Sequence, residues 1–372
     1  MNNPEDFSIA FLRNRSSLYI CAAGFEDRVI GIVETLNGTN EKIFKYCNIF
    51  EYQSHTSPQQ DQESSFLKGE KSQKSSFLEK NKENLSYLKR ALRNLSVNFV
   101  DNTVIDIDNM LVTERNLESA LNKIPEAEID SIFVDISGMA NFLILLTLHK
   151  VSASFCNKAI FVLYSEAEDY LPRKEEASEI IQIAKSRDET SIIKLGELLG
   201  ATGARETFVL PDFKGYFKED FPICLVFLVG YEPSRAVGLL DGYRPNLVVA
   251  CYGVSPRKRF KWRTIFSEEL HERLNVFRQY NSSKMKISTF NISKIVSKLE
   301  EIYVSADSNG SILYEKYNIA VTPQCSKLQT VATYLFCQSH PDIQVVFCLP
   351  GSFNPDRYSK GIGKKWLYKI TA

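Results

Sequence analysis

Two stretches of this 372-residue chain resemble each other, and this internal repeat constrains the fold more than any other feature. The first, GFEDRVIGIV, covers Gly24 to Val33, and the second, GYEPSRAVGLL, covers Gly230 to Leu240 with one inserted residue. A later pair of segments, 130–173 and 316–359, matches at a constant offset, so that strand, turn, helix and strand patterns coincide. The chain is therefore expected to consist of two halves that repeat one plan.

Each half alternates short apolar runs with segments of helical periodicity. Continuous apolar runs of about 4–8 residues are typical of strands buried on both faces of a parallel sheet. The runs that predict strands are 18–23, 43–50, 104–107, 131–136, 159–164, 223–229, 247–251, 317–322 and 344–349. The segments that predict helices are 29–36, 84–95, 116–124, 141–151, 175–200, 236–240, 266–277, 294–305 and 328–336. This alternation predicts an α/β fold with two tandem Rossmann-like parallel-sheet domains related by internal duplication.

Turn-forming residues separate the two halves. Glycines and then Pro211 interrupt the pattern, which places the boundary near residues 203–218. We therefore expect residues 1–203 to form the first Rossmann-like domain and residues 204–372 the second. The first half also contains a polar insertion at about residues 53–82, rich in Ser, Gln, Lys and Glu, which suits a mobile insertion or a polar helical extension.

Composition excludes several classes of protein. The 45 basic and 45 acidic residues give zero net charge, so no overall field attracts the chain to nucleic acid or to an anionic membrane. The eight cysteines are scattered, and no Cys/His cluster has the spacing of metal ligands, so neither a metal nor another cofactor is predicted. The N-terminus lacks the order of a signal peptide, and no apolar run approaches the ~20 residues that span a bilayer. We expect a cytoplasmic protein with no membrane association.

The repeated motif places a Gly, a Glu and an Arg directly after the first strand of each half. That position lies at the carboxyl edge of a parallel sheet, where such sheets bind ligands. Glycine allows the tight turn, and arginine can form a fork of hydrogen bonds to a phosphate, with the glutamate orienting it or binding a sugar or base. A structural ion pair that fixes the loop explains the same residues. The candidates are Gly24, Glu26 and Arg28 in the first half and Gly230, Glu232 and Arg235 in the second.

A second loop in each half joins a buried strand to a helix. In the first half it contains Ser137, Gly138 and Asn141, and in the second it contains Ser326 and Lys327. Small polar side chains there can cap the helix or hold a phosphate at its N-terminus. Lys327 supplies a positive charge where the first half has the uncharged Asn141, so the two halves are not expected to contribute equally.

One dense basic segment, SPRKRFKWR, lies in the second half. Cationic and aromatic side chains in alternation suit phosphate contacts and base stacking, although a solvated loop or a docking patch for an acidic partner explains them equally well. The candidate contacts to nucleic acid or a partner are Arg257, Lys258, Arg259, Lys261, Trp262 and Arg263.

The second loops, VDISGMANFLILL and VTPQCSKLQTVATYL, look like degenerate forms of the Thr-Gly-Gly-Thr-Lys-type loop of CARF domains, the CRISPR-associated Rossmann-fold sensors. Lys327 matches the family's lysine and Ser326 its preceding hydroxyl, whereas Ala140 and Asn141 depart from the pattern. Two such units in tandem also resemble the SAVED sensors of bacterial defence systems. The resemblance implies binding of a cyclic oligonucleotide phosphate and signalling to a separate effector protein, because no Arg-x4-6-His ribonuclease motif is present.

Three hypotheses follow. The leading one is a nucleotide-sensing module of a prokaryotic antiviral defence or stress system, with a phosphate-bearing ligand in the cleft between the two halves. The second is an enzyme that cleaves a nucleotide phosphodiester or glycosidic bond with Glu26 or Glu232 as acid or base. The third is a non-catalytic scaffold subunit of a defence complex, whose basic segment contacts a partner.

Overall fold

The computed structural model describes residues 4–39, 41–53, 68–100, 102–186, 189–306 and 310–370. The chain forms two compact units. Unit 1 contains residues 1–170 together with 359–372, and unit 2 contains residues 171–358.

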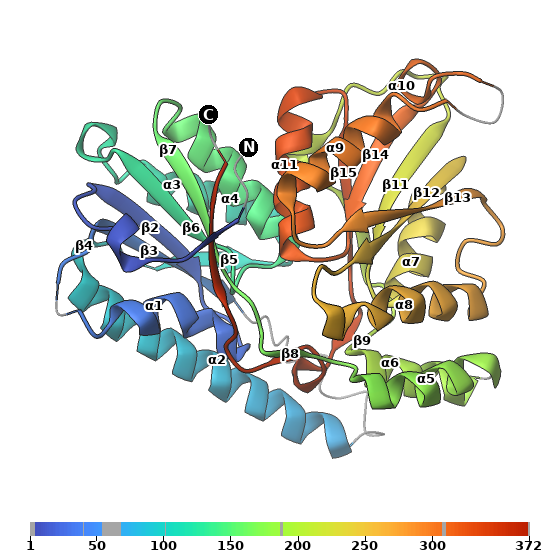
Figure 1. The fold of residues 1–372 in the computed structure, drawn as a ribbon, viewed down its shortest axis with the longest axis horizontal. Helices are drawn as coiled ribbons and strands as arrows, with labels where there is room; N and C mark the ends of the chain where they lie inside the picture. Colours follow the sequence, from blue (N-terminus) through green and yellow to red (C-terminus); the bar gives the residue numbers. More distant parts are fainter. Residues whose placement is uncertain are drawn as a thin grey trace. The chain divides into compact units, whose positions relative to one another are not determined.

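A mainly parallel sheet forms the centre of unit 1 (Figure 1). Its parallel part has the order β7-β6-β2-β3, with β4 and β5 pairing one after the other along the outer side of β3. On the other side, β18 pairs antiparallel with β7, and β1 pairs with β18. The strands are β1 (Glu5–Asp6), β2 (Ser17–Ala22), β3 (Phe44–Gln53), β4 (Ser96–Phe99), β5 (Thr103–Asp106), β6 (Ser131–Asp135), β7 (Ala159–Ser165) and β18 (Lys365–Lys369).

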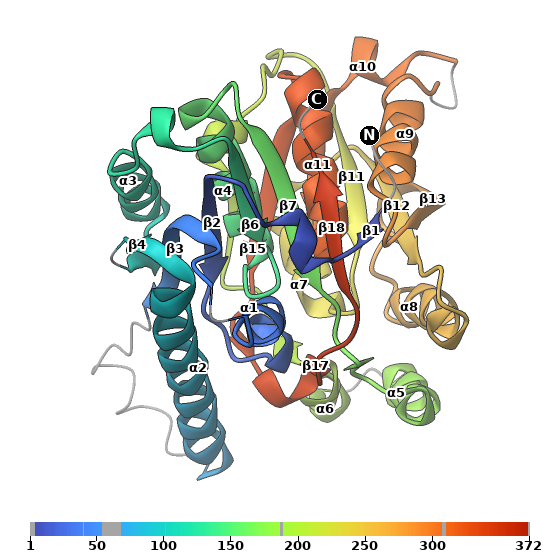
Figure 2. The same ribbon diagram turned by 60° about the vertical axis from the view of Figure 1, so that its left-hand side comes forward.

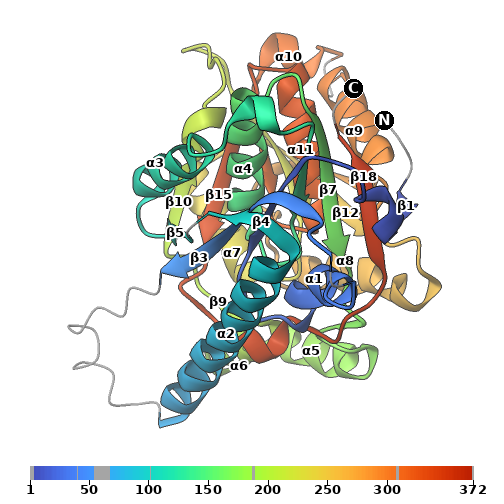
Figure 3. The same ribbon diagram turned by 90° about the vertical axis from the view of Figure 1, so that its left-hand side faces the viewer.

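Helices cover both faces of the unit 1 sheet. In Figure 2, α1 (Gly31–Leu36) and α2 (Lys68–Leu95) lie on one face, and α3 (Met110–Leu121) and α4 (Asn141–Ser154) lie on the other. The apolar α4 is buried over most of its length, as its sequence predicts. Figure 3 shows α2 as a long helix that extends beyond the strands, so the helical extension predicted for the polar insertion is present from residue 68. Residues 54–67 of that insertion lie outside the described residues.

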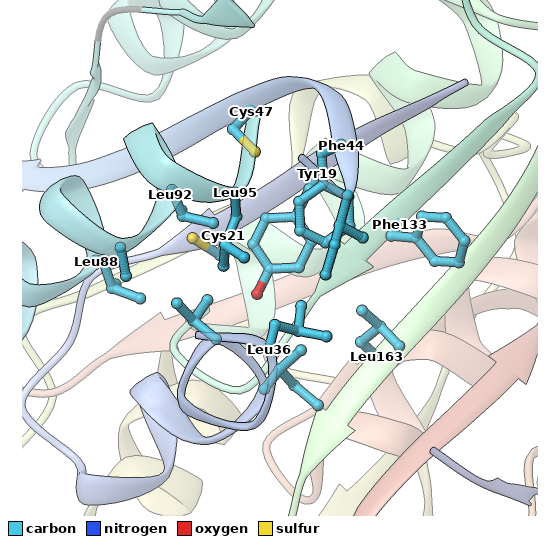
Figure 4. Close-up of a cluster of buried hydrophobic side chains, with 14 of the residues drawn as sticks. Tyr19, Cys21, Leu36, Phe44, Cys47, Leu88, Leu92, Leu95, Phe133 and Leu163 are labelled. Carbon is cyan, nitrogen blue, oxygen red and sulfur yellow. The ribbon is translucent and has the colours of Figure 1, made fainter. Parts of the chain in front are cut away.

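The core of unit 1 is aromatic and aliphatic and lies between the sheet and the helices α1 and α2. Tyr19 stacks on Phe44 with ring centroids 4.6 Å apart, and Phe133 stacks on Phe161 at 5.2 Å. Figure 4 shows the ring of Tyr19 among aliphatic side chains of both helices, including Leu36, Leu88, Leu92 and Leu95. Burying this apolar surface, at ~25 cal/mol per Å², is what holds the short α1 in place.

Unit 2 is built on a second sheet with the order β10-β15-β14-β11-β12-β13. All neighbours are parallel except β10, which pairs antiparallel with β15. The strands are β10 (Glu206–Val209), β11 (Ile223–Val229), β12 (Leu247–Val254), β13 (Asn281–Ser288), β14 (Asn318–Pro323) and β15 (Gln344–Leu349). The α/β fold class with parallel sheets is thus confirmed.

The helices of unit 2 also cover both faces of its sheet. One face packs against α7 (Pro233–Tyr243) and the segment that follows α8 (Trp262–Arg273), and the other against α9 (Ile292–Tyr303) and α11 (Lys327–Ser339). The charged segment predicted as a single helix over 175–200 is a pair of helices, α5 (Lys174–Ser186) and α6 (Glu189–Leu199), which pack on α8 through a separate apolar cluster. The short α10 (Leu313–Lys316) precedes β14.

The division into units differs from the boundary expected near residue 203. Residues 171–203 belong to unit 2, because α5 and α6 bury their apolar faces against α8. Residues 359–372 belong to unit 1, because β18 pairs with β7 along five residues and buries Leu367 in that core. Reasoning from chain order alone could not find a strand that returns to the first unit.

The two sheets have the same parallel order once corresponding strands are matched. In unit 1 the first strand of the parallel part, β2, lies between β6 and β3, and in unit 2 the first strand of the parallel part, β11, lies between β14 and β12. Beyond β6 in unit 1 lies β7, and beyond β14 in unit 2 lies β15. Each of these strands has an antiparallel neighbour, which is β18 for β7 and β10 for β15. This shared order agrees with the internal duplication, which stays a prediction. Within the described residues, no helix is long and apolar enough to cross a membrane.

Leu367→Ala tests the assignment of the C-terminal strand to unit 1. Leu367 is 4% exposed in the unit 1 core, so its truncation should lower the free energy of unfolding by about 2–4 kcal/mol in urea denaturation. The control is Lys369→Ala on the same strand, whose side chain is exposed. Equal stability of both variants and the parent would contradict the assignment.

Candidate functional site

The loops predicted to bind a ligand leave the carboxyl ends of neighbouring parallel strands. In unit 1 they follow β2 and β6, and in unit 2 they follow β11 and β14. Because β2 pairs with β6 and β11 pairs with β14, the two loops of each unit emerge at the same edge of its sheet. Open α/β sheets bind ligands at this edge.

Two glycines let these loops touch backbone to backbone. In unit 1, a Cβ atom added to Gly138 would lie 2.2 Å from the carbonyl oxygen of Ala22. In unit 2, a Cβ atom added to Gly230 would lie 2.2 Å from the carbonyl oxygen of Gln324. No side chain fits at such a distance, so the structure gives Gly138 and Gly230 a packing role.

The Arg28 side chain is buried in a closed network. Its Nη2 donates to both carboxylate oxygens of Glu26, at 2.7 and 2.9 Å, and its Nη1 donates to the hydroxyl of Tyr164 at 3.0 Å. The hydroxyl of Ser359 donates to the same carboxylate, and the guanidinium lies 5.8 Å from the ring centroid of Tyr170. Burial opposes the charge of Arg28, but Glu26 outweighs burial and holds the arginine pKa above its ordinary value. The pair is a structural clamp on the first loop.

Side chains from other elements hold the rest of the unit 1 edge. The carbonyl oxygen of Gly24 accepts a hydrogen bond from Asn84 of α2 at 2.7 Å. The hydroxyl of Tyr52, from β3, donates to the carbonyl oxygen of Gly138 at 3.2 Å and accepts from the backbone N–H of Ala140 at 2.7 Å. Asn84 and Tyr52 were not identified from the sequence, and nothing local in it marks their role.

Ser137 is fully buried and bonded on both sides. Its hydroxyl donates to Asp135 Oδ1 at 2.5 Å and accepts from the backbone N–H of Ser165 at 2.9 Å. The other oxygen of Asp135 accepts from the hydroxyl of Tyr19 at 2.7 Å. Burial, reinforced by the charge of Asp135, raises the pKa of Tyr19 far above its ordinary range. The predicted ligand contact of Ser137 is therefore already occupied by protein groups.

In unit 2, Glu232 and Arg235 form the ion pair that corresponds to Glu26 and Arg28. Arg235 Nη1 lies 2.5 Å from a carboxylate oxygen of Glu232, and Nη2 donates to the carbonyl oxygen of Cys348 at 3.0 Å. The two side chains are only 20% and 15% exposed. Burial lowers the pKa of Arg235, and the charge of Glu232 raises it. The raising effects are larger in sum, so the pKa of Arg235 lies above its ordinary value. The structure thus shows in both units the ion pair that the sequence left as one of two alternatives.

The second loop of unit 2 begins α11 with a capping box. Ser326 is the N-cap, and its hydroxyl accepts from the backbone N–H of Gln329 at 3.3 Å while donating to the carbonyl oxygen of Thr289 at 2.9 Å. In return, Gln329 Oε1 accepts from the backbone N–H of Ser326 at 3.2 Å. The two roles expected of Ser326 were to cap the helix and to hold a phosphate. Both are compatible with this geometry, because its hydroxyl lies at the helix N-terminus.

Lys327 and Asn141 occupy the same position in their respective helices. Lys327 is the first residue of α11 and Asn141 the first residue of α4, and both are half-buried. The N-cap of α4 is Ala140, which makes no side-chain capping bond. The two residues therefore have matching positions in their helices, and the positive charge of Lys327 distinguishes the unit 2 helix start.

Three buried polar atoms have no hydrogen-bond partner where β14 ends, in the loop that follows it and in the first turn of α11. They are Thr322 Oγ1, Gln324 Nε2 and Gln329 Nε2. Because Gln329 Oε1 is used by the capping box, its Nε2 is left as the unpaired donor. Each unpaired buried group costs about 1–3 kcal/mol, so three within eight residues of the chain are a considerable cost to stability. The sequence reasoning missed Gln324 and Gln329, although both stand beside Ser326 and Lys327 in the same motif.

The expectation that Arg263 contacts a partner or nucleic acid was wrong. This side chain is 6% exposed and donates hydrogen bonds to three oxygens of unit 2. Nε donates to the hydroxyl of Tyr231 at 2.8 Å, and the two terminal nitrogens donate to the carbonyl oxygens of Leu171 and Pro172, each at 2.9 Å. Arg263 instead fixes the segment that enters unit 2.

The rest of the basic segment divides between surface and core. Lys258, Arg259 and Lys261 are exposed, whereas Trp262 is half-buried against Phe266 with ring centroids 5.7 Å apart. Arg257 lies over the ring of Phe290, 6.0 Å from its centroid. A contact between the three exposed cations and nucleic acid or a partner stays a prediction.

Among the described residues, no group of three or more His, Cys, Asp or Glu side chains could hold a metal ion.

No protein-family model matches the chain, and no curated protein matches it. Among solved structures, a type III CRISPR defence DNA nuclease activated by cyclic oligoadenylate superposes with a TM-score of 0.44 and 9% sequence identity over 86% of this chain. The match covers 64% of the nuclease, so the chain spans less than two thirds of its length. A universal stress protein from Archaeoglobus fulgidus DSM 4304 matches with a TM-score of 0.24 and 10% identity, over 93% of this chain and 99% of that protein.

Removing one partner of the Arg28–Glu26 pair should destabilise unit 1 strongly. Arg28→Met leaves a buried carboxylate without its counter-charge, and we expect the free energy of unfolding to fall by about 3–5 kcal/mol. The double variant Arg28→Met with Glu26→Gln should recover part of that loss. Arg13→Met, in a half-exposed pair with Glu41, is the control and should change stability by less than about 1 kcal/mol. A small effect of Arg28→Met in denaturant titration would argue against a structural clamp.

Arg263→Met distinguishes a structural from a binding role. Loss of its three hydrogen bonds leaves two backbone carbonyls unpaired, so we expect a loss of about 3 kcal/mol or more in unfolding free energy. Lys258→Met, at an exposed cation of the same segment, should leave stability unchanged. If Arg263→Met were as stable as the parent protein, the buried role described above would be wrong.

Proposed function

We propose that this chain is a nucleotide-sensing module that binds a phosphate-bearing ligand at the carboxyl edge of the unit 2 sheet, in the loop between β14 and α11. The single observation that carries the proposal is the set of unpartnered polar atoms of Thr322 at the end of β14, Gln324 in the loop and Gln329 in the first turn of α11. Two amide donors and a hydroxyl match the acceptor oxygens of a phosphate, and pairing with them would recover the cost of burying these groups alone.

The position of the loop supports binding of an anion. The N-terminus of α11, a helix of 13 residues, lies at this edge, and the N-terminus of a helix attracts anions. Lys327 adds a positive charge at the first position of the helix. Because this loop resembles that of CARF sensors through Ser326 and Lys327, we assign the ligand to the nucleotides and the process to prokaryotic defence or stress signalling, with a separate effector protein as the recipient.

We assign a structural role to the corresponding edge of unit 1. Ser137 is bonded to Asp135 and Ser165, and the carbonyl of Gly138 is bonded to Tyr52. With Asn141 in place of a lysine, this edge offers a weaker attraction for phosphate. The ion pairs also speak against the hydrolytic alternative, because the carboxylates of both Glu26 and Glu232 are occupied by arginines.

Thermal-shift measurements against a panel of ligands test this function. The panel contains cyclic and linear oligoadenylates, AMP, NAD and inorganic phosphate. A ligand present at a hundred times its dissociation constant should stabilise the protein by ~2.7 kcal/mol. We expect one phosphate-bearing nucleotide to raise the melting temperature, and Lys327→Ala and Gln324→Leu each to abolish that shift while the variants stay folded.

Two matched controls sharpen the experiment. Lys294→Ala removes an equal charge from an exposed position of α9, and Asn141→Ala alters the matching position of unit 1. Both should keep the shift. Arg235→Ala is not a clean test, because it leaves the buried Glu232 unpaired. Flat melting curves for every ligand, or a shift that survives Lys327→Ala and Gln324→Leu, would overturn the proposal.

A further inference from the structure

A cavity of about 200 Å³ lies in unit 2 away from the loops described above, between β12, β13 and the C-terminal end of α8. Its lining residues are Tyr252, His271, Glu272, Asn275, Phe277, Arg278, Ser282 and Lys284. Pockets that bind drug-sized ligands measure ~300–1,000 Å³, so this cavity suits a smaller molecule with a single ring system.

Three aromatic side chains form the inner wall of the cavity. The rings of His271 and Phe277 are stacked, with centroids 5.8 Å apart and an interplanar angle of 11°. Tyr252 meets His271 edge to face, with centroids 6.0 Å apart and an angle of 77°. Parallel and perpendicular ring faces of this kind favour a planar aromatic guest, because aromatic groups pair in these two geometries.

The wall also contains hydrogen-bonding atoms without partners. Tyr252 is fully buried, and its hydroxyl has no hydrogen-bond partner. His271 Nδ1 lies 2.8 Å from the carbonyl oxygen of Ser267, which can only accept, so Nδ1 carries the proton. Burial lowers the pKa of His271 to about 4, so the ring is neutral at pH 7 and its Nε2 is an acceptor. The structure gives Nε2 no partner among the described residues. A guest ring would thus meet one donor, the tyrosine hydroxyl, and one acceptor, Nε2.

The rim of the cavity carries a net positive charge. Lys284 is paired with Glu272, so these two charges cancel. Arg278 is exposed, and no carboxylate of the described residues pairs with it. The other rim side chains, Asn275 and Ser282, are neutral. An anionic substituent at the mouth of the cavity would therefore find one available cation.

We propose that this cavity is a second ligand site, which binds a small planar nitrogen heterocycle that carries a carboxylate or phosphate. The ring lies against the aromatic wall and accepts a hydrogen bond from Tyr252, and the anionic group contacts Arg278. The site does not depend on the function proposed above, and it lies on different elements from the β14–α11 loop.

Isothermal titration of the full chain with four probes tests this site. Nicotinate has both the ring nitrogen and the carboxylate, benzoate lacks the ring nitrogen, and nicotinamide lacks the charge. AMP presents a larger heterocycle with a phosphate. We expect nicotinate to bind at least about ten-fold more tightly than benzoate and nicotinamide, because each analogue loses one of the two polar contacts. Tighter binding of AMP than of nicotinate would identify the source of the ring as a nucleotide and would also support the site.

Two variants connect binding to the cavity. Tyr252→Phe removes only the unpartnered hydroxyl, and Arg278→Ala alters an exposed side chain, so both should melt at the temperature of the parent protein. Each should weaken binding of the best probe about ten-fold, whereas Lys294→Ala should not. The same binding should persist in Lys327→Ala, which separates this site from the β14–α11 loop. Absence of binding by both nicotinate and AMP, or binding that is equal in the parent and in both cavity variants, would overturn the proposal.

Discussion

The close approach of two backbone loops at the carboxyl edge of each sheet is the constraint on which the rest of the structure depends. In unit 1 the glycine that permits it, Gly138, lies in the second loop, and in unit 2 the glycine, Gly230, lies in the first. Each contact brings a strand end and a helix start within reach of each other. A side chain at either position would separate the loops and displace the N-terminus of α4 or α11 from the sheet edge.

The carboxyl edges of the two sheets differ in how fully their buried polar groups are hydrogen-bonded. In unit 1, Asp135, Ser137 and Tyr52 bond the polar groups of the second loop, and the unpartnered atoms near this edge, Arg28 Nε and Ser165 Oγ, lie outside that loop. In unit 2, the capping box uses the Oε1 atom of Gln329. The Nε2 atoms of Gln329 and Gln324 are both left without a hydrogen-bond partner. Unsatisfied buried donors reduce stability, and natural proteins tolerate them mainly at sites with a function. This asymmetry is the physical basis for the proposal that a ligand binds in unit 2.

Much of the fold could be predicted from the sequence, because continuous apolar runs such as 223–229 and 344–349 are strands with those same bounds in the structure. β13 could not, since Asn281–Ser288 is a polar edge strand without an apolar run. The return of β18 to unit 1 and the helix pair within residues 174–199 depend on tertiary packing, which no local pattern contains.

The candidate site was predictable in part. The motifs located the loops and the pairing of Glu with Arg, since these residues follow the strands at the sheet edge. They could not show that Arg263 is buried, because its partners are backbone carbonyls about ninety residues away in the chain. Nor could they show which amide groups are left unpaired. That depends on the orientation of the Gln329 side chain, whose Oε1 is bonded in the helix cap while its Nε2 has no partner.

The most direct test of the central claim is to observe the side-chain amides of the unit 2 loop by NMR in protein labelled with ¹⁵N-glutamine. Titration begins with cyclic oligoadenylate and continues with the other nucleotides. The account predicts that the Nε2 signals of Gln324 and Gln329 shift together on binding, whereas that of Gln344, already bonded to the carbonyl oxygen of Lys214 at 2.7 Å, stays in place. Saturable binding that leaves the Gln324 and Gln329 signals unmoved would contradict it.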